Sequence, residues 1–136
     1  MKIDGRAIVI GVWLPLVVWA VAVLIVGVVN HQPGVVCMTP VAWLMALWVG
    51  LRCGAWSRST DRSSRLKEAA IGGVLFGILQ GLLFAVVVPF MGPISDAERQ
   101  KAFILVAAIV VAGALVSGVL SLAIAASQER RRTSAL

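Results

Sequence analysis

One stretch of the sequence decides the fold: Gly72-Gly73-Val74-Leu75-Phe76-Gly77-Ile78-Leu79-Gln80-Gly81. Three of its glycines, Gly73, Gly77 and Gly81, are spaced four residues apart within an apolar run. In a helix this spacing places them on one face, where a second helix can approach backbone to backbone. In a lipid bilayer such faces are where helices associate, because apolar bulk gives no preference for protein over lipid. The stretch therefore predicts the packing face of a membrane helix.

The composition extends this prediction to the whole chain. Of its 136 residues, 60% are hydrophobic and 13% are charged, whereas about 25% are charged in a typical soluble domain. The apolar residues form long blocks, which is typical of an integral membrane protein. We expect an all-α membrane protein, a single domain over residues 1–136. Its four transmembrane helices are expected at about 7–29, 35–56, 66–91 and 96–128.

The start of the second span has two interpretations. Thr39 followed by Pro40 has the pattern of a helix N-cap with proline in the first turn. That helix would end at Trp56 and would be short for a membrane span. Alternatively, the helix begins near Pro33 and is kinked at Pro40.

The starts of the third and fourth helices carry clearer signals. Asp61 or Ser64 is the expected N-cap of the third helix, within a polar loop that follows Trp56. Ser95 and Glu98 have the spacing of a capping box, so the fourth helix is expected to begin near Asp96, before it enters the lipid.

The net charge of +6 is distributed as expected for a membrane protein, and we do not expect nucleic-acid binding. Ten of the twelve Lys and Arg residues lie in the N-terminal segment, between the second and third apolar blocks, or after the fourth. By the positive-inside rule this predicts an antiparallel bundle with both termini cytoplasmic, in the cytoplasmic (inner) membrane. Eight basic residues are expected to anchor the chain to anionic lipid headgroups on the cytoplasmic side: Arg52, Arg58, Arg62, Arg65, Lys67, Arg130, Arg131 and Arg132.

Small residues recur at four-residue spacing in three of the four helices, which predicts that these helices pack on one another. Many of these residues fall in the cytoplasmic half of the predicted spans, whereas bulkier groups fall in the outer half. We therefore expect a bundle that is closely packed toward the cytoplasm and splayed toward the outside. The helix-packing positions are Ala42, Ala46, Gly50 and Gly54 in the second helix, Gly73, Gly77 and Gly81 in the third, and Gly113, Ser117, Ser121 and Ala125 in the fourth.

Few polar groups lie near the middle of the spans. Gln80 and the indole N–H of Trp19 both fall near the centre of their apolar blocks. A buried amide at this depth needs hydrogen-bond partners. We expect Gln80 to face inward and to bond Trp19, Ser117 or a backbone carbonyl. The alternative is that Gln80 contacts a substrate or pigment.

The sequence offers few groups for catalysis. No ionisable residue lies in the middle of a predicted span, where a proton-coupled carrier would need one. The one histidine, His31, falls in the expected outer turn, so we expect neither a metal nor a cofactor. Cys37 and Cys53 are expected on one helix, about 24 Å apart, which is too far for a disulfide. We therefore do not expect an enzyme.

These features predict a structural role. In outline the chain resembles small four-span bacterial membrane proteins that have a basic loop after the second span and a glycine-rich third span. We expect an accessory subunit or stabiliser of a larger membrane complex, which packs against other membrane subunits or against itself. The alternative is an oligomeric pore or a carrier for lipid or small apolar molecules, including a phage-type hole-forming protein.

Overall fold

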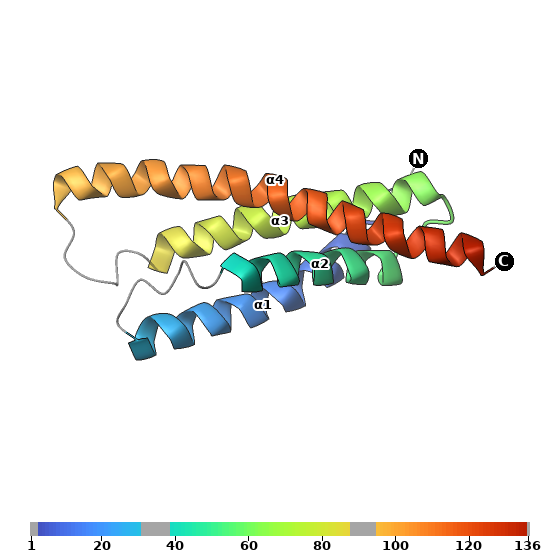
Figure 1. Cartoon of the computed structure of the whole chain (residues 1–136), viewed down its shortest axis with the longest axis horizontal. Helices are drawn as coiled ribbons and strands as arrows, with labels where there is room; N and C mark the ends of the chain where they lie inside the picture. Colours follow the sequence, from blue (N-terminus) through green and yellow to red (C-terminus); the bar gives the residue numbers. More distant parts are fainter. Residues whose placement is uncertain (1–2, 31–38, 88–94, 136) are drawn as a thin grey trace.

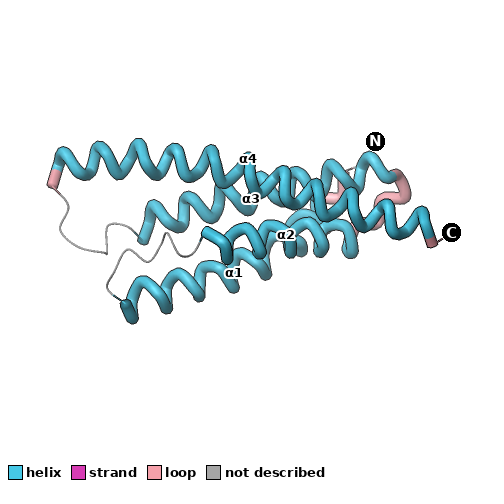
Figure 2. Tube along the Cα trace, viewed as in Figure 1, coloured by secondary structure: helices cyan, strands magenta, loops and turns pink. Residues whose placement is uncertain are grey.

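The protein is all-helical in the part that the structure describes. The structure is a computed structural model that describes residues 3–30, 39–87 and 95–135. It contains α1 (Gly5–Asn30), α2 (Thr39–Trp56), α3 (Arg62–Val87) and α4 (Asp96–Ser134), arranged as an elongated bundle with both termini at one end (Figure 1). These ranges include no strand (Figure 2).

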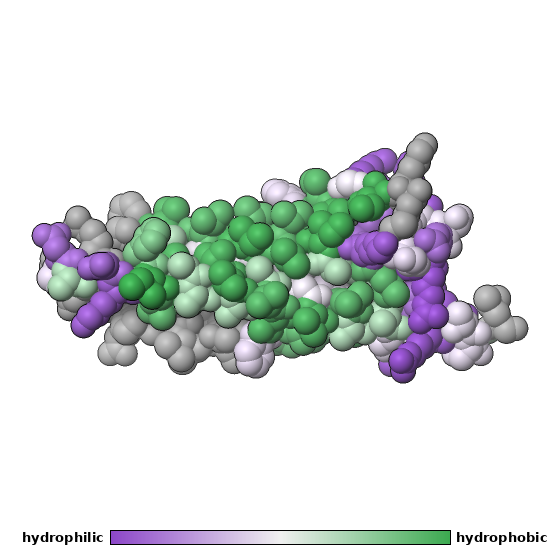
Figure 3. Space-filling model, turned by 90° about the horizontal axis from the view of Figure 1, so that it is seen from above, coloured by the Kyte–Doolittle hydropathy of each residue, from purple (hydrophilic) through white to green (hydrophobic). Residues whose placement is uncertain are grey.

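Three of the helices are long and apolar enough to cross a membrane. Their candidate spans lie within Gly5–Ile25, Arg62–Val86 and Phe103–Ser134. The apolar part of α2, Val41–Trp56, is shorter. A broad apolar surface covers the middle of the molecule, and hydrophilic residues gather at its two ends (Figure 3). This distribution is that of a membrane protein.

The described helix starts agree with the capping signals in the sequence. α2 begins at Thr39, and the alternative start near Pro33 lies outside the described residues. At the start of α3, Asp61 Oδ1 accepts a hydrogen bond from the Ser63 N–H at 3.3 Å, and Asp61 Oδ2 accepts one from the Ser64 N–H at 3.2 Å. α4 begins at Asp96, whereas the side chain of Glu98 lies outside the described residues.

α2 and α3 lie at the centre of the bundle, and both α1 and α4 pack against them. α1 packs on α2 and α3, and α4 packs mainly on α3 and also on α2. Phe76 of α3 and Val49 of α2 are fully buried in the core, together with the free thiol of Cys53. Gly11 and Gly72 approach Cys53 so closely that a Cβ at either position would overlap its sulfur. Cys37 lies outside the described residues.

The glycine face of α3 lies directly against α4. A Cβ at Gly73 would overlap the carbonyl oxygen of Ser117, and a Cβ at Gly81 would overlap the side chain of Val110. At Gly77 the nearest atoms are the Gly113 carbonyl and, at 2.6 Å, the Cα of Ala114. Because most of these neighbours are backbone atoms, they cannot move aside as a flexible side chain would. The glycines allow the two helix backbones to touch.

α4 is covered along only part of its length. Among its described residues, every buried one lies at Ser117 or later. Before that point the large apolar side chains are exposed, with Phe103 76% and Leu115 65% accessible. The ribbons of α1 and α4 also diverge toward the end opposite the termini (Figure 1). This arrangement agrees in direction with the expected splay, although the cytoplasmic assignment of the packed end stays a prediction.

Candidate functional site

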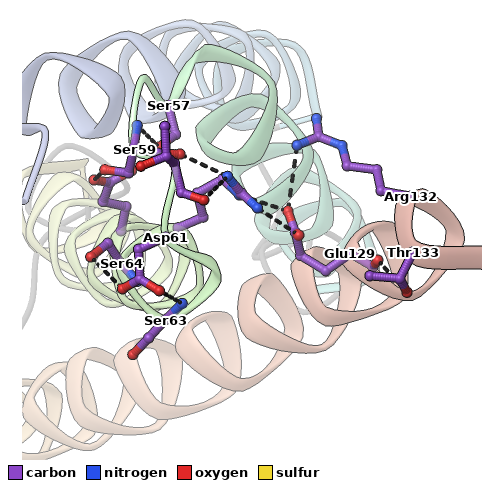
Figure 4. Close-up of polar contacts among 11 residues, drawn as sticks. Ser57, Ser59, Asp61, Ser63, Ser64, Glu129, Arg132 and Thr133 are labelled. Atoms are coloured by element: carbon purple, nitrogen blue, oxygen red, sulfur yellow. Dashed lines mark hydrogen bonds and ion pairs between the residues drawn. The ribbon is translucent and has the colours of Figure 1, made fainter. Parts of the chain in front are cut away.

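The most elaborate group of polar contacts lies at the end of the bundle that carries the termini. It joins four segments of the chain: the N-terminal segment, the loop between α2 and α3, the first turns of α3 and the last turns of α4 (Figure 4). We name this group the polar clasp and define it as Asp4, Ser59, Arg65, Glu68 and Glu129.

Glu68 is the most buried member of the polar clasp, with none of its surface exposed. Its Oε1 atom accepts a hydrogen bond from the Asp4 N–H and another from the Ser59 hydroxyl, both at 2.8 Å. Its Oε2 atom has no hydrogen-bond partner among the described residues. One carboxylate oxygen therefore holds both the N-terminal segment and the α2–α3 loop against α3.

Arg65 and Glu129 form the second half of the polar clasp. The guanidinium donates through Nε to Glu129 Oε1 and through Nη2 to Glu129 Oε2, both at 2.8 Å. Nη1 of Arg65 donates to the carbonyls of Ser59 at 2.7 Å and Thr60 at 3.1 Å. The two side chains are 17% and 7% exposed. This bidentate geometry is the strong form of an arginine–carboxylate pair and ties α3 to α4.

Asp61 lies beside the polar clasp, and its pKa is lowered from the ordinary value of 3.8. The main cause is the Ser64 hydroxyl, which donates to the carboxylate, and the Ser63 N–H adds to it. These bonds favour the charged form, so they stabilise the fold above the pKa of the unfolded state. They are lost as the pH falls through the lower pKa of the folded state.

This pKa shift predicts how an Asp61→Asn variant depends on pH. We expect the free energy of unfolding to be higher in the original protein than in the variant at neutral pH. The difference should narrow as the pH falls below 3.8, since Asp61 then becomes protonated. Denaturant unfolding followed by circular dichroism between pH 2.5 and 7 measures both proteins. A difference that stays constant over this range would contradict the assignment.

Three of the eight expected headgroup anchors contact protein groups in the structure. Arg52 donates through Nε and Nη2 to the Ile10 carbonyl at 3.4 and 3.3 Å, and its guanidinium carbon lies 5.9 Å from the ring centroid of Trp48. Arg65 is bound within the polar clasp, and Arg132 lies 3.4 Å from Glu129. These three residues bind protein groups because their carbonyl and carboxylate partners come from neighbouring turns and helices. All eight remain predicted anchors, and Arg132, at 53% exposure, is accessible like the other five: Arg58, Arg62, Lys67, Arg130 and Arg131.

An open recess adjoins the polar clasp. Its volume is about 670 Å³, and its lining contains carboxylates, hydroxyls and one arginine. The lining residues are Ile3, Asp4, Arg58, Ser59, Thr60, Asp61 and Ser64.

A second cavity lies at mid-length between α2, α3 and α4, with a volume of about 210 Å³. Gln80 lines it, and the Oε1 atom of Gln80 is buried without a hydrogen-bond donor among the described residues. We name it the Gln80 cavity. Its lining is Ala42, Trp43, Gln80, Ile109, Ala112, Gly113, Val116 and Ser117.

Gln80 was expected to form a hydrogen bond, and this prediction is wrong for its side-chain oxygen, Oε1, which has no partner among the described residues. Trp19 Nε1 is also buried, and it has no acceptor among the described residues. The reason is the arrangement of the helices, since Trp19 packs into the apolar core from α1, whereas Gln80 borders the cavity between the other three helices. Ser117, the other predicted partner, lines the same cavity and is buried.

The small residues of α2 and α4 that recur at four-residue spacing face one another in the structure. Gly50 lies against Ser121 and Ile124, and Gly54 lies against Gln128. The Ser121 hydroxyl donates to the Ala46 carbonyl at 2.6 Å, which adds a buried hydrogen bond between the two helices. The remaining predicted positions Ala42, Ser117 and Ala125 are buried, whereas Gly113 is half-buried opposite Gly77.

Four members of the polar clasp were not predicted from the sequence: Asp4, Ser59, Glu68 and Glu129. The available signal was the position of Glu68 and Glu129, two acidic residues inside segments that are otherwise basic. The polar clasp contains two long-range pairs, Asp4 with Glu68 and Arg65 with Glu129. In each pair the two residues are 64 positions apart in the chain.

Comparison with protein-family models, with curated proteins and with solved structures gives no match for this chain. The functional proposals therefore rest on the contacts described above.

Proposed function

We propose that the chain crosses the cytoplasmic membrane four times as an antiparallel bundle, with both termini in the cytoplasm. The end of the bundle that carries the termini also carries the α2–α3 loop and most of the basic residues. The positive-inside rule assigns such an end to the cytoplasm.

We propose further that the protein is a non-enzymatic accessory subunit or stabiliser of a larger membrane complex. The single observation that carries this proposal is the exposed face of the first half of α4, on the side away from α3. Phe103, Ile104 and Leu115 are each more than 60% exposed, and no described residue of this half is buried. Lipid can cover apolar side chains as well as a protein can, but the exposed small residues Ala107 and Ala108 on this half allow a helix of another subunit to approach closely.

The proposed partner surface differs from the one expected from the sequence. From the sequence, the small-residue stripes were expected to serve contacts with other subunits or with a second copy. In the structure Gly50, Gly73 and Gly77 are occupied by contacts within the chain. The exposed part of α4 before Ser117, which includes the small residues Ala107 and Ala108, replaces them as the partner surface.

Site-specific photo-crosslinking in the native membrane tests the proposal. A photoreactive amino acid at Leu115 or Ile104 should give a discrete adduct with another protein chain, identified by mass spectrometry. The matched control is Val9 of α1, which is similarly exposed at 66% and lies on a different helix. From Val9 we expect adducts with lipid and none with another protein chain. Lipid adducts alone from all three positions would exclude a stable partner on α4.

A second function is favoured by the Gln80 cavity. A carrier or binding protein for small apolar molecules needs an apolar cavity that opens within the membrane, and this cavity lies at mid-length between three helices. The carrier function would show as protein-dependent flux of an apolar solute across liposome membranes.

A further inference from the structure

We propose that the Gln80 cavity binds an apolar molecule that carries a hydroxyl group, a lipophilic phenol or alcohol, whose hydroxyl donates to Gln80 Oε1. The proposal goes beyond the subunit role, because it concerns the space between α2, α3 and α4 and not the outer surface of α4.

The volume of the cavity suits a ring-sized ligand. A dry apolar cavity of about 150 Å³ in another protein is sufficient to bind benzene. The Gln80 cavity, at about 210 Å³, has room for a six-membered ring with a short substituent. Ile109 and Val116 supply aliphatic surface, and the partly exposed indole of Trp43 supplies an aromatic face at its edge. Such a lining favours apolar and aromatic ligands.

The chemistry of the lining selects the polar group of the ligand. Gln80 Oε1 is a buried acceptor that receives no hydrogen bond from the described residues. Gln80 lines the cavity, and rotation of its amide about the last side-chain torsion would bring Oε1 to a ligand there. A buried polar group of this kind is stabilised by any donor that reaches it, since an unmet acceptor loses its hydration without compensation. A lipid acyl chain has no donor to offer, whereas a hydroxyl on an apolar molecule has one. The cavity therefore discriminates between a hydroxylated ligand and its hydrocarbon analogue.

The site is assembled only in the folded bundle. Trp43 comes from α2, Gln80 from α3 and Ala112 from α4. The close contact of Gly77 with Gly113, one turn from Gln80, fixes the separation of the two helices beside the cavity. Any ligand that enters must therefore fit a cavity whose walls are held by backbone contacts.

The test uses a matched pair of probes, 4-ethylphenol and 4-ethyltoluene, which differ by a hydroxyl in place of a methyl group. The full chain is labelled with 5-fluorotryptophan and placed in lipid nanodiscs, and the ¹⁹F resonance of Trp43 is assigned with a Trp43→Phe variant. The probes are compared at equal concentration in the bilayer. We expect a saturable shift of the Trp43 resonance, with half-saturation at about tenfold lower concentration for 4-ethylphenol, as one hydrogen bond to a buried acceptor provides.

Variants separate the hydrogen bond from the cavity itself. Gln80→Leu should remove the difference between the probes. Ala112→Leu should fill the cavity and abolish the saturable shift for both probes. The matched control, Ala123→Leu, changes an exposed alanine three turns later on α4 that lines neither the cavity nor the proposed partner surface, and it should behave as the original protein. An equal response to both probes in the original protein, or a saturable shift that survives Ala112→Leu, would overturn the proposal. These outcomes are independent of the crosslinking result, so the two proposals can fail separately.

Discussion

Gly77→Ala is expected to lower the free energy of unfolding by about 1–3 kcal/mol, the usual cost of forcing extra volume into a well-packed interface. The new methyl group would overlap the carbonyl of Gly113 and would lie close to the Cα of Ala114. Both are backbone atoms, so α3 and α4 must separate along their shared face to admit it. Unfolding in mixed micelles with increasing fractions of a denaturing detergent, followed by circular dichroism, measures the loss.

The matched control is the same substitution on the opposite side of the contact. A Cβ at Gly113 would have the Gly77 carbonyl oxygen as its nearest neighbour, at 3.5 Å, which is an ordinary van der Waals distance. Because alanine also has the better helix propensity, Gly113→Ala should be neutral or slightly stabilising. Equal losses for the two variants would contradict this unequal contact between α3 and α4.

Glu129→Leu is expected to destabilise the bundle by about 3 kcal/mol, at the low end of the range for removing one partner of a buried ion pair. The substitution leaves the guanidinium of Arg65, only 17% exposed, without its bidentate acceptor at the α3–α4 contact. Detergent unfolding of the same kind measures the effect. Raised protease sensitivity of the last turns of α4 would report it independently.

Two controls identify the pair as the cause. Arg132→Ala removes the other cation near Glu129, which lies at 3.4 Å and is 53% exposed, so its loss should cost little. In a double-mutant cycle, Arg65→Leu combined with Glu129→Leu should cost less than the sum of the single variants, since no unpaired charge remains. Strict additivity would argue against a direct interaction.

The local features of the fold were predictable because they depend on short stretches of sequence. The spacing of Gly73, Gly77 and Gly81 is enough to predict a face without side chains. Residue type and position limit the cap of α3 to Asp61 or Ser64, and the structure shows that it is Asp61. The structure adds that the glycine face lies against α4, at Ser117, Gly113 and Val110.

The polar contacts were not predictable in the same way. Arg65 and Glu129 are 64 residues apart, and their pairing depends on the alignment of α3 with α4 along the bundle. A shift by one turn would point Glu129 elsewhere, and nothing in the sequence fixes that alignment residue by residue. The same reason explains the error at Gln80, since the polarity of its amide indicates a need for partners but not which helix face it occupies.

The two ends of α4 differ in how firmly they are packed, and this difference has a mechanical consequence. With 39 residues and a rise of about 1.5 Å per residue, α4 is about 58 Å long, nearly twice the ~30 Å thickness of a hydrocarbon core. Its last turns are fixed by the bidentate bond to Arg65, and its middle is held by the contacts of Val110 and Gly113 with α3, whereas no described residue before Val110 is buried. Tilt or bending of the segment before Val110 is therefore one way to relieve hydrophobic mismatch when a bilayer thickens or thins.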